Sequence, residues 1–484
     1  MITAVFTAER EHASMSTHTA FTMTIGGRAV HGRTTFAVVD PATLRTAGEA
    51  PDCTPEQLDE AVTAARRAQP AWAALSETDR QRHLVAIADV VDAHVDELAR
   101  LVVGEQGKPL ALAVGEVGGL AHWLRETATL GLPVTVNQDD AERRSVTTHV
   151  PLGVVAAITP WNYPLGQLGF KLGPALLAGN AVVLKPSTFT PLSALRLGEL
   201  LRDVLPPGVL NVVSGGDDLG PRVTAHPGFD KISFTGSTET GRAVAASAAA
   251  TLAHVTLELG GNDPAIVLPD VDVDAVAEQL FWAAFANSGQ ICVATKRLYV
   301  HTDVYDRLVA ALTKIAADVR VGNGLDEGVQ LGPVSHGRQH ARIVDLLDDA
   351  RAHGYEFLTG DVGETDGYFV RPTIIGDPPD DARIVREEQF GPVLPVLRFS
   401  DVDDVVDRAN AGEYGLGASV WTGDPDAAVA LARRLRAGTV WINEVMHLSP
   451  HVPFGGMKQS GLGVESGVAG LLEFTERQTV TVRR

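Results

Sequence analysis

Cys292, Glu258 and Asn162 are the residues whose chemistry and surroundings first suggest a reactive site. Cys292 lies in a polar, glycine-containing loop and is the only candidate nucleophile, although a lone cysteine is more often a buried structural thiol. Glu258 ends an apolar run just before two glycines, at a position where a carboxylate is ordinarily solvated. Asn162 can donate hydrogen bonds through its amide, but an asparagine in a turn beside proline often only shapes the turn.

Composition argues against several other kinds of partner and site. The 484 residues include 40 Lys and Arg against 60 Asp and Glu, and the formal charge of -20 repels nucleic-acid phosphates and anionic membrane surfaces. Only two cysteines are present, Cys53 and Cys292, and no metal-ligand motif is found, so we expect neither a disulfide framework nor a metal site. No run of about 18 apolar residues and no signal-peptide pattern occur. We predict a cytoplasmic protein whose residues 1–20 form a disordered lead.

The elements that must position these residues follow from hydrophobic periodicity. Two amphipathic helices are expected over 55–102, starting after Thr54 and Ser76, and a third runs to about residue 132. From residue 151, short apolar runs alternate with helical stretches, which is typical of a doubly wound parallel sheet. The predicted strands are 154–158, 181–184, 209–213, 231–234 and 255–259, and the predicted helices are 165–178, 191–204, 218–225 and 239–250.

The pattern then changes near residue 260, and a second α/β lobe is expected, because a chain of this length exceeds one ordinary core. Its predicted strands are 265–268, 395–399, 418–421 and 439–442, and its predicted helices are 273–286, 303–318, 402–411 and 425–436.

Ligands of doubly wound sheets bind beyond the carboxyl ends of the strands, and polar or glycine-rich loops follow four strands here. These loops begin at Trp161, Lys185, Gly215 and Thr235. The segment Gly236-Ser237-Thr238-Glu239-Thr240-Gly241 could offer backbone amides at a helix N-terminus to a phosphate, although a short Gly/Ser turn is more often just a helix cap.

Six motifs resemble the signature set of the aldehyde dehydrogenase superfamily and occur in family order. They are Pro160-Trp161-Asn162, Phe234-Thr235-Gly236-Ser237, Glu258-Leu259-Gly260-Gly261, Gly289-Gln290-Ile291-Cys292, Glu388-Gln389-Phe390-Gly391-Pro392 and the glycine-rich stretch from Pro453 to Gly461. The resemblance covers about residue 25 to the C-terminus. It implies an α/β fold with a Rossmann-like cofactor domain (21–132 and 151–259), an α/β catalytic domain (260–470) and a small β oligomerisation arm (133–150 and 471–484), assembled as a homodimer or homotetramer.

The same resemblance implies oxidation of a small-molecule aldehyde to the carboxylic acid by NAD or NADP. Cys292 would add to the aldehyde to form a thiohemiacetal and then a thioester, and Glu258 would be the general base for hydrolysis of that thioester. The Asn162 amide and the backbone N–H of Cys292 would form the oxyanion hole. Cys53 is expected to be inert.

Cofactor residues implied by the resemblance are Trp161, Lys185, Ser187, Thr188, Gly236, Ser237, Glu388 and Phe390. One position departs from the family pattern: Thr188 stands where NAD-preferring members commonly carry a glutamate that holds the adenosine ribose. A carboxylate there would repel a 2′-phosphate, so its absence leaves NADP open as a cofactor.

The substrate tunnel is expected to be mostly apolar, with no arginine to clamp a carboxylate. Its predicted lining is Tyr163, Gln167, Phe170, Ile291, Val293, Leu448 and Phe454, with the histidines His447 and His451 either near its mouth or simply on the surface. Two alternatives remain open. A CoA-acylating relative tends to lack the base that Glu258 supplies, and a non-catalytic protein of the same fold would have little reason to keep Cys292, Glu258 and Asn162 together.

Overall fold

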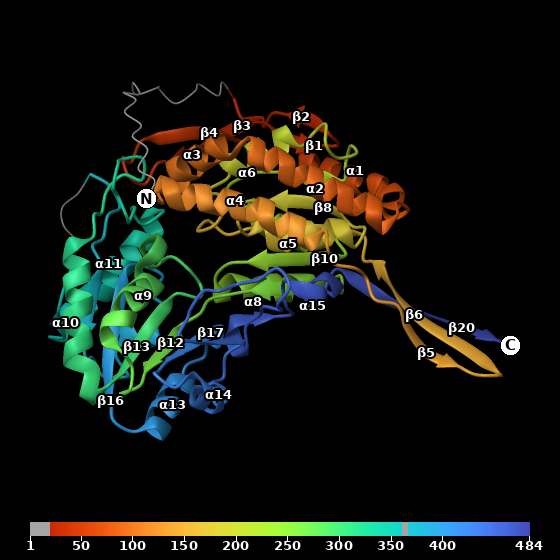
Figure 1. The fold of residues 1–484 in the computed structure, drawn as a ribbon. Helices are drawn as coiled ribbons and strands as arrows, with labels where there is room; N and C mark the ends of the chain where they lie inside the picture. Colours follow the sequence, from red (N-terminus) through yellow and green to blue (C-terminus); the bar gives the residue numbers. More distant parts are fainter. Residues whose placement is uncertain (1–19, 361–365) are drawn as a thin grey trace, which may run out of the picture.

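The computed structural model describes residues 20–360 and 366–484, so the predicted lead lies almost entirely outside the described residues. Two large sheets form the cores of two lobes, and a separate three-stranded sheet projects from the body as an arm (Figure 1). Among the described residues, no helix has the length and apolar character needed to cross a membrane.

The first sheet has the strand order β19-β11-β10-β7-β8-β9-β1-β2. Its central strands are parallel and lie where the apolar runs predict them: β7 (Val154–Ile158), β8 (Ala181–Lys185), β9 (Leu210–Val212), β10 (Lys231–Thr235) and β11 (His254–Glu258). The direction of strand progression reverses between β7 and β10, which is where ligands of such sheets bind. Antiparallel strands extend both edges, with β1 (Met23–Ile25) and β2 (Arg28–Val30) at one and β19 (Gly461–Leu462) at the other.

Helices cover this sheet. Those that connect its strands are α5 (Leu168–Leu177), α6 (Leu192–Leu200), α7 (Leu219–Ala225) and α8 (Thr238–Ala248). The preceding helices are α1 (Pro55–Ala73), α2 (Glu77–Ala93), α3 (Val95–Gln106) and α4 (Leu110–Thr127), and α2 and α4 pack together against α5 (Figure 1). The single helix predicted to start after Ser76 is therefore two helices, because His94 adopts a non-helical backbone (φ -120°, ψ 19°) that ends α2.

The second sheet has the order β14-β15-β16-β13-β12-β17-β18, and all its pairs are parallel except β14 with β15. Its strands are β12 (Asp263–Val267), β13 (Thr295–His301), β14 (Glu356–Phe357), β15 (Thr373–Gly376), β16 (Val393–Phe399), β17 (Gly417–Trp421) and β18 (Thr439–Ile442). Its longer helices are α9 (Val273–Phe285), α10 (Thr302–Asp318), α11 (Gly337–Ala352), α13 (Val402–Asn410) and α14 (Pro425–Ala432). The apolar patterns did not predict β13, β15 or α11.

Shorter elements complete the described chain. They are β3 (Thr34–Val39), β4 (Thr46–Asp52), the 3₁₀ turns η1 (Ala286–Gly289) and η2 (Lys458–Ser460), α12 (Arg383–Arg386) and α15 (Gly467–Leu472).

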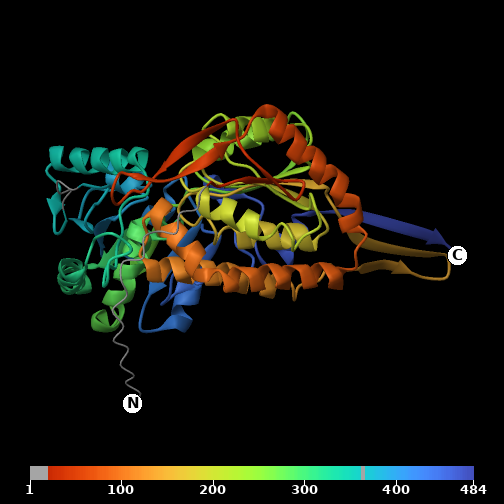
Figure 2. The same cartoon turned by 90° about the horizontal axis from the view of Figure 1, so that it is seen from above.

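The arm is built from two distant parts of the chain. It contains β5 (Thr135–Asp139), β6 (Arg143–Pro151) and β20 (Thr475–Arg483), with β6 in the middle and antiparallel to both neighbours. In two perpendicular views the arm extends away from the lobes (Figures 1 and 2). Its outer strands β5 and β20 therefore each have one edge that pairs with no strand of the described chain.

Candidate functional site

The loop that carries Cys292 is held by an unusual backbone and by buried hydrogen bonds. Asn287, Ser288 and Gly289 all have positive φ (51°, 55° and 69°), a conformation that non-glycine residues adopt only when their surroundings enforce it. The Ser288 hydroxyl donates to the Gly332 carbonyl (2.7 Å), and a Cβ at Gly289 would overlap the Gly391 carbonyl oxygen (2.1 Å). These contacts hold the half-buried Cys292 in one place.

Asn162 lies against this loop. Its side-chain Nδ2 donates to the carbonyl of Gln290 (2.9 Å), two residues before Cys292, and the side chain is buried. Because an amide nitrogen carries two hydrogens, this bond leaves a second hydrogen for another acceptor. The structure thus brings Asn162 to the nucleophile loop from the other lobe.

Glu258 ends β11 between β10 and β19, and only 3% of its surface is exposed. Burial raises its pKa well above the usual carboxyl value, the Glu465 carboxylate raises it further, and the Lys171 ammonium lowers it. Its Oε1 atom is buried and has no hydrogen-bond partner within the described chain. Burial also raises the pKa of Cys292, and the negative charge of Glu258 raises it further.

A buried ion pair behind Glu258 was not predicted. Lys171 of α5 donates to Glu465 Oε1 (2.7 Å) and to the Ser233 hydroxyl (3.3 Å), and both charged side chains are almost fully buried. The only signal in the sequence was a single lysine inside an otherwise apolar helical stretch. Because Glu465 lies 294 residues further along the chain, nothing local pointed to its pairing with Lys171.

Five of the seven predicted tunnel residues lie in one apolar cluster with Cys292. They are Tyr163, Ile291, Val293, Leu448 and Phe454. Phe170 lies outside this cluster, and the centroid of its ring is 4.5 Å from that of Trp123. Gln167 is joined to the cluster because its backbone N–H donates to the carbonyl of Tyr163 (3.1 Å). His447 and His451 are surface residues, each beside a glutamate.

The predicted cofactor residues of the first lobe lie at the ends of β8 and β10. Lys185 ends β8, its Nζ donates to the Pro186 carbonyl (3.0 Å), and burial lowers its pKa to about 8. The Ser187 hydroxyl accepts from Phe189 N (3.3 Å), and the Thr188 hydroxyl donates to the Gly215 carbonyl (3.0 Å). All three lie on one loop beyond the carboxyl end of the sheet.

The loop after β10 leads into a helix N-terminus. Ser237 caps α8 by accepting a hydrogen bond from Thr240 N (3.2 Å). A Cβ on Gly236 would lie 2.4 Å from the Phe234 ring, so only glycine fits beside that ring. Thr235 Oγ1, at the end of β10, is buried and lacks a hydrogen-bond partner within the described residues. This sheet edge is suited to bind a dinucleotide, because it brings together the buried Lys185 ammonium, the unpartnered Thr235 hydroxyl and the N-terminus of α8.

The second lobe faces this edge with Glu388 and Phe390. Glu388 Oε1 accepts from Gly261 N (3.0 Å), three residues after Glu258. The Phe390 ring packs edge-on against Trp161 (5.2 Å between centroids), and Trp161 contacts the His336 ring in the same way (4.8 Å). The predicted cofactor residues of the two lobes therefore face one another.

The family model described as "Aldehyde dehydrogenase family" matches residues 29–480. The chain belongs to the aldehyde dehydrogenase family. A phenylacetaldehyde dehydrogenase from Pseudomonas fluorescens is 41% identical over 481 residues, covering 95% of this chain and 95% of that protein. The NAD+ complex of an aldehyde dehydrogenase from Bacillus cereus is 36% identical with a TM-score of 0.93, covering 96% of each chain. An NADP-dependent enzyme of E. coli is 37% identical with a TM-score of 0.92, covering 96% of this chain and 98% of that one.

Membership of the aldehyde dehydrogenase family confirms the predicted α/β fold and the predicted reaction class. The protein is an oxidoreductase that converts an aldehyde to the acid with a nicotinamide dinucleotide, NAD or NADP.

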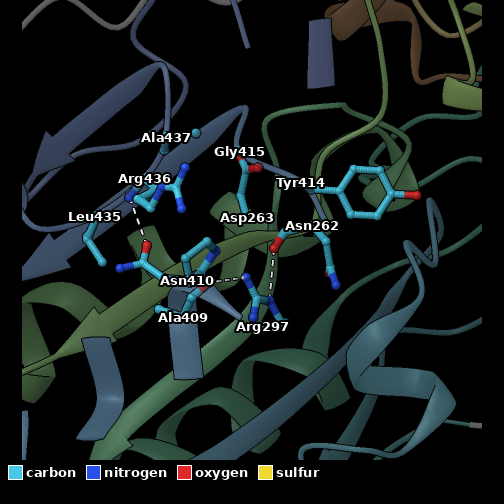
Figure 3. Close-up of a pocket in the computed structure, with 13 residues that line it drawn as sticks. Asn262, Asp263, Arg297, Ala409, Asn410, Tyr414, Gly415, Leu435, Arg436 and Ala437 are labelled. Carbon is cyan, nitrogen blue, oxygen red and sulfur yellow. Dashed lines mark hydrogen bonds between the residues drawn. The ribbon is translucent and has the colours of Figure 1, made fainter. Parts of the chain in front are cut away.

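A separate small pocket lies behind the start of β12 (Figure 3). The buried Arg297 donates there to the carbonyls of Asn262 (2.9 Å) and Ala409 (3.0 Å), and burial raises the pKa of Asp263 to about 8. None of the proposed site residues of this aldehyde dehydrogenase lines the pocket. The Arg297 guanidinium is already hydrogen-bonded to backbone carbonyls. We therefore assign the pocket to the framework that supports the loop after Glu258.

Proposed function

We propose that Cys292 is the nucleophile, Glu258 the general base and Asn162 the oxyanion donor of this aldehyde dehydrogenase. The observation that carries the proposal is the buried, unpartnered Glu258 Oε1 of a carboxyl group that acts electrostatically on the Cys292 thiol. A carboxyl group whose pKa is raised by burial is a better proton acceptor near neutral pH than a solvated one.

The geometry supports a two-stage reaction. Glu258 takes the thiol proton, the Cys292 sulfur adds to the aldehyde carbon, and the resulting oxyanion receives hydrogen bonds from the free hydrogen of the Asn162 amide and the Cys292 backbone N–H. A nicotinamide dinucleotide bound here would supply the hydride acceptor, and loss of hydride from this carbon would leave a thioester on Cys292. After releasing its first proton to solvent, Glu258 takes a proton from water as the water attacks the thioester, and the acid departs as the sulfur is freed.

The Lys171–Glu465 pair sets the basicity of Glu258 in this proposal. The Glu465 carboxylate raises the Glu258 pKa and the Lys171 ammonium lowers it. The pair therefore keeps the Glu258 pKa below that of an isolated buried carboxyl group and above that of a carboxylate in a direct salt bridge. Glu465 is also joined by backbone hydrogen bonds to Phe454 of the apolar cluster, which links the base to the substrate wall.

We assign the cofactor to the facing edges of the two lobes. Lys185, Ser187 and Thr188 would hold its adenosine side, and Gly236 and Ser237 its phosphates. Glu388, Phe390 and Trp161 would contact the nicotinamide half. The absence of a carboxylate at position 188 supports acceptance of both NAD and NADP.

The substrate we propose is a neutral, apolar aldehyde. The cluster around Cys292 is aliphatic and aromatic, as expected for a tunnel that gains affinity by burying apolar surface. Two lysines that contact members of this cluster are already paired, Lys108 with Glu116 and Lys296 with the Ile291 carbonyl. The similarity to a phenylacetaldehyde dehydrogenase agrees with this substrate class.

We also propose that the arm joins copies of the chain into a homodimer or homotetramer in the cytoplasm. The open edges of β5 and β20 and the exposed side chains of Val136, Val480 and Val482 support an interface there. Both cysteines are unpaired thiols, which suits a reducing compartment.

The test of the mechanism is Glu258→Gln, which keeps the side-chain shape but removes the base. We expect a burst of one NAD(P)H per active site followed by turnover slower by about 10²- to 10⁴-fold, because the thioester forms but is not hydrolysed. Mass spectrometry should find an acyl adduct on Cys292. Full steady-state turnover in this variant would refute the role of Glu258, and rapid CoA-dependent formation of an acyl-CoA by the native enzyme would favour the acylating alternative.

A further inference from the structure

A lysine is buried in the connection between α3 and α4. Lys108 is 1% exposed, and lysine is almost never fully buried unless it is paired. Its Nζ donates to Glu116 Oε2 (2.5 Å) and to the backbone carbonyl of Asn162 (2.7 Å). The same ammonium lies 3.6 Å from the centroid of the Tyr163 ring. The contacts of the Lys108 ammonium are therefore its counter-ion Glu116 and two neighbouring residues of the proposed site, Asn162 and Tyr163.

Glu116 of α4 holds the other end of the same segment. Its Oε1 accepts hydrogen bonds from Leu165 N and Gly166 N, each 2.9 Å long, and its side chain has no exposed surface. The ion pair thus fixes the loop after β7 at two points, at the Asn162 carbonyl by Lys108 and at the two following amides by Glu116.

The Asn162 carbonyl is also the point where the two lobes meet. It receives a second hydrogen bond from Asn287 Nδ2 (3.3 Å), while the Asn162 side chain donates to Gln290 O. Asn287 and Gln290 both belong to the loop that carries Cys292. A displacement of the Asn162 backbone would therefore move its amide relative to the thiol.

The attraction between the two charges does not by itself account for such a pair. The cost of removing two charges from water is large, and apolar residues of similar volume often replace a buried ion pair without loss of stability. Apolar side chains could not, however, satisfy the Asn162 carbonyl and the two loop amides at once.

We propose that Lys108 and Glu116 are positioning residues that set the direction of the Asn162 amide toward the oxyanion. This inference rests on the proposed role of Asn162. It assigns a catalytic consequence to an ion pair that touches neither substrate nor cofactor.

The test is a double-mutant cycle on kcat/KM for the aldehyde. Lys108→Met should lower kcat/KM by about ten- to a hundredfold in the native background, since small misplacements of catalytic groups have effects of this size. In the Asn162→Ala background the same change should have an effect of less than about twofold, because the group that it positions is gone. The KM for NAD should stay within about twofold throughout.

Glu116→Gln gives a second, milder route to the same result, because the glutamine keeps an oxygen for Leu165 N and Gly166 N while removing the negative charge. Its effect should also vanish in the Asn162→Ala background. Equal losses in both backgrounds, for either variant, would show that the pair acts only on stability and would overturn the proposal.

A matched control is available on α3. Glu105 is equally buried, but it accepts from Leu192 N and from Ser193 at the start of α6. Glu105→Gln should lower the Tm and leave kcat/KM within about twofold of the native value. The single variant Asn162→Ala separates the two ideas: native kcat/KM in that variant would refute its oxyanion role, whereas a loss without coupling to Lys108 would refute the positioning role alone.

Discussion

Replacing Thr188 with glutamate tests where the adenosine end of the cofactor lies. Thr188 is half-buried on the loop after β8, three residues after Lys185, and its hydroxyl donates to the Gly215 carbonyl (3.0 Å). A carboxylate at this position would face the ribose hydroxyls of NAD as an acceptor and the 2′-phosphate of NADP as a like charge. Selectivity should move toward NAD.

The size of the shift follows from electrostatics. A carboxylate and a phosphate of charge near -1.5 at about 6 Å repel by about 1 kcal/mol in bulk water and about 4 kcal/mol at an effective dielectric constant of 20. Loss of the Thr188–Gly215 hydrogen bond costs about 1 kcal/mol, but this cost applies to both cofactors and cancels in their ratio. A net change of about 1 to 3 kcal/mol, or about 5- to 150-fold, is expected.

The measurement is the ratio of kcat/KM for NADP and NAD in the native enzyme and in Thr188→Glu, at fixed ionic strength because salt screens the phosphate. Thr188→Gln is the control, since it has the same size without the charge, and it should leave the ratio near the native value. An unchanged ratio in Thr188→Glu would mean that position 188 does not face the adenosine ribose.

The pH dependence of the native enzyme provides an independent check. Burial lowers the pKa of Lys185 to about 8 from 10.5, so its positive charge is present below pH 8 and is lost as the pH rises through that value. If Lys185 contacts the adenosine phosphate, kcat/KM for NADP should fall more steeply above pH 8 than kcat/KM for NAD.

Two further outcomes follow from single side chains. Cys292→Ala should abolish dehydrogenase turnover, while a fluorescence titration should show nearly native affinity for NAD. Cys53→Ala should have little effect on the rate. Native turnover by Cys292→Ala would disprove the thioester route. Arg297→Met should lower the free energy of unfolding by about 2 to 4 kcal/mol, because it leaves the buried carbonyls of Asn262 and Ala409 without their donor. An unchanged midpoint of urea unfolding would contradict this account of the pocket in Figure 3.

Hydrophobic patterning predicted the parallel strands of the first sheet because each contains a short run or alternation of apolar residues, and three of them, β7, β8 and β10, are buried along their whole length. The same logic failed for β13, whose Lys296 and Arg297 make it look solvent-exposed. Both side chains are buried, and their charges are satisfied by the Ile291 carbonyl and by the Asn262 and Ala409 carbonyls respectively. Periodicity cannot show that a charged residue has a partner from another strand or loop.

The same limit separates the predicted site residues from those that were missed. Cys292, Glu258 and Asn162 stand in motifs whose local sequence is informative, and their assigned roles stay predictions until the variants are measured. Lys171 and Lys108 stand in ordinary helical or loop sequence. Their importance comes from partners brought together by the fold, at Glu465 and at the Asn162 carbonyl, and from burial that no local pattern reveals.

Strand β19 makes the order of synthesis matter for this enzyme. Gly461 pairs with Glu258 across the sheet edge, so the environment of the proposed base is completed by a segment translated about two hundred residues later. While the chain is still being made, the first lobe exposes the β11 edge, with its Glu258 carboxyl open to water and unable to hold a raised pKa. A nascent chain that has already formed its cofactor half therefore still lacks the strand that completes the surroundings of the proposed base, and its β11 edge stays open to pairing with other strands.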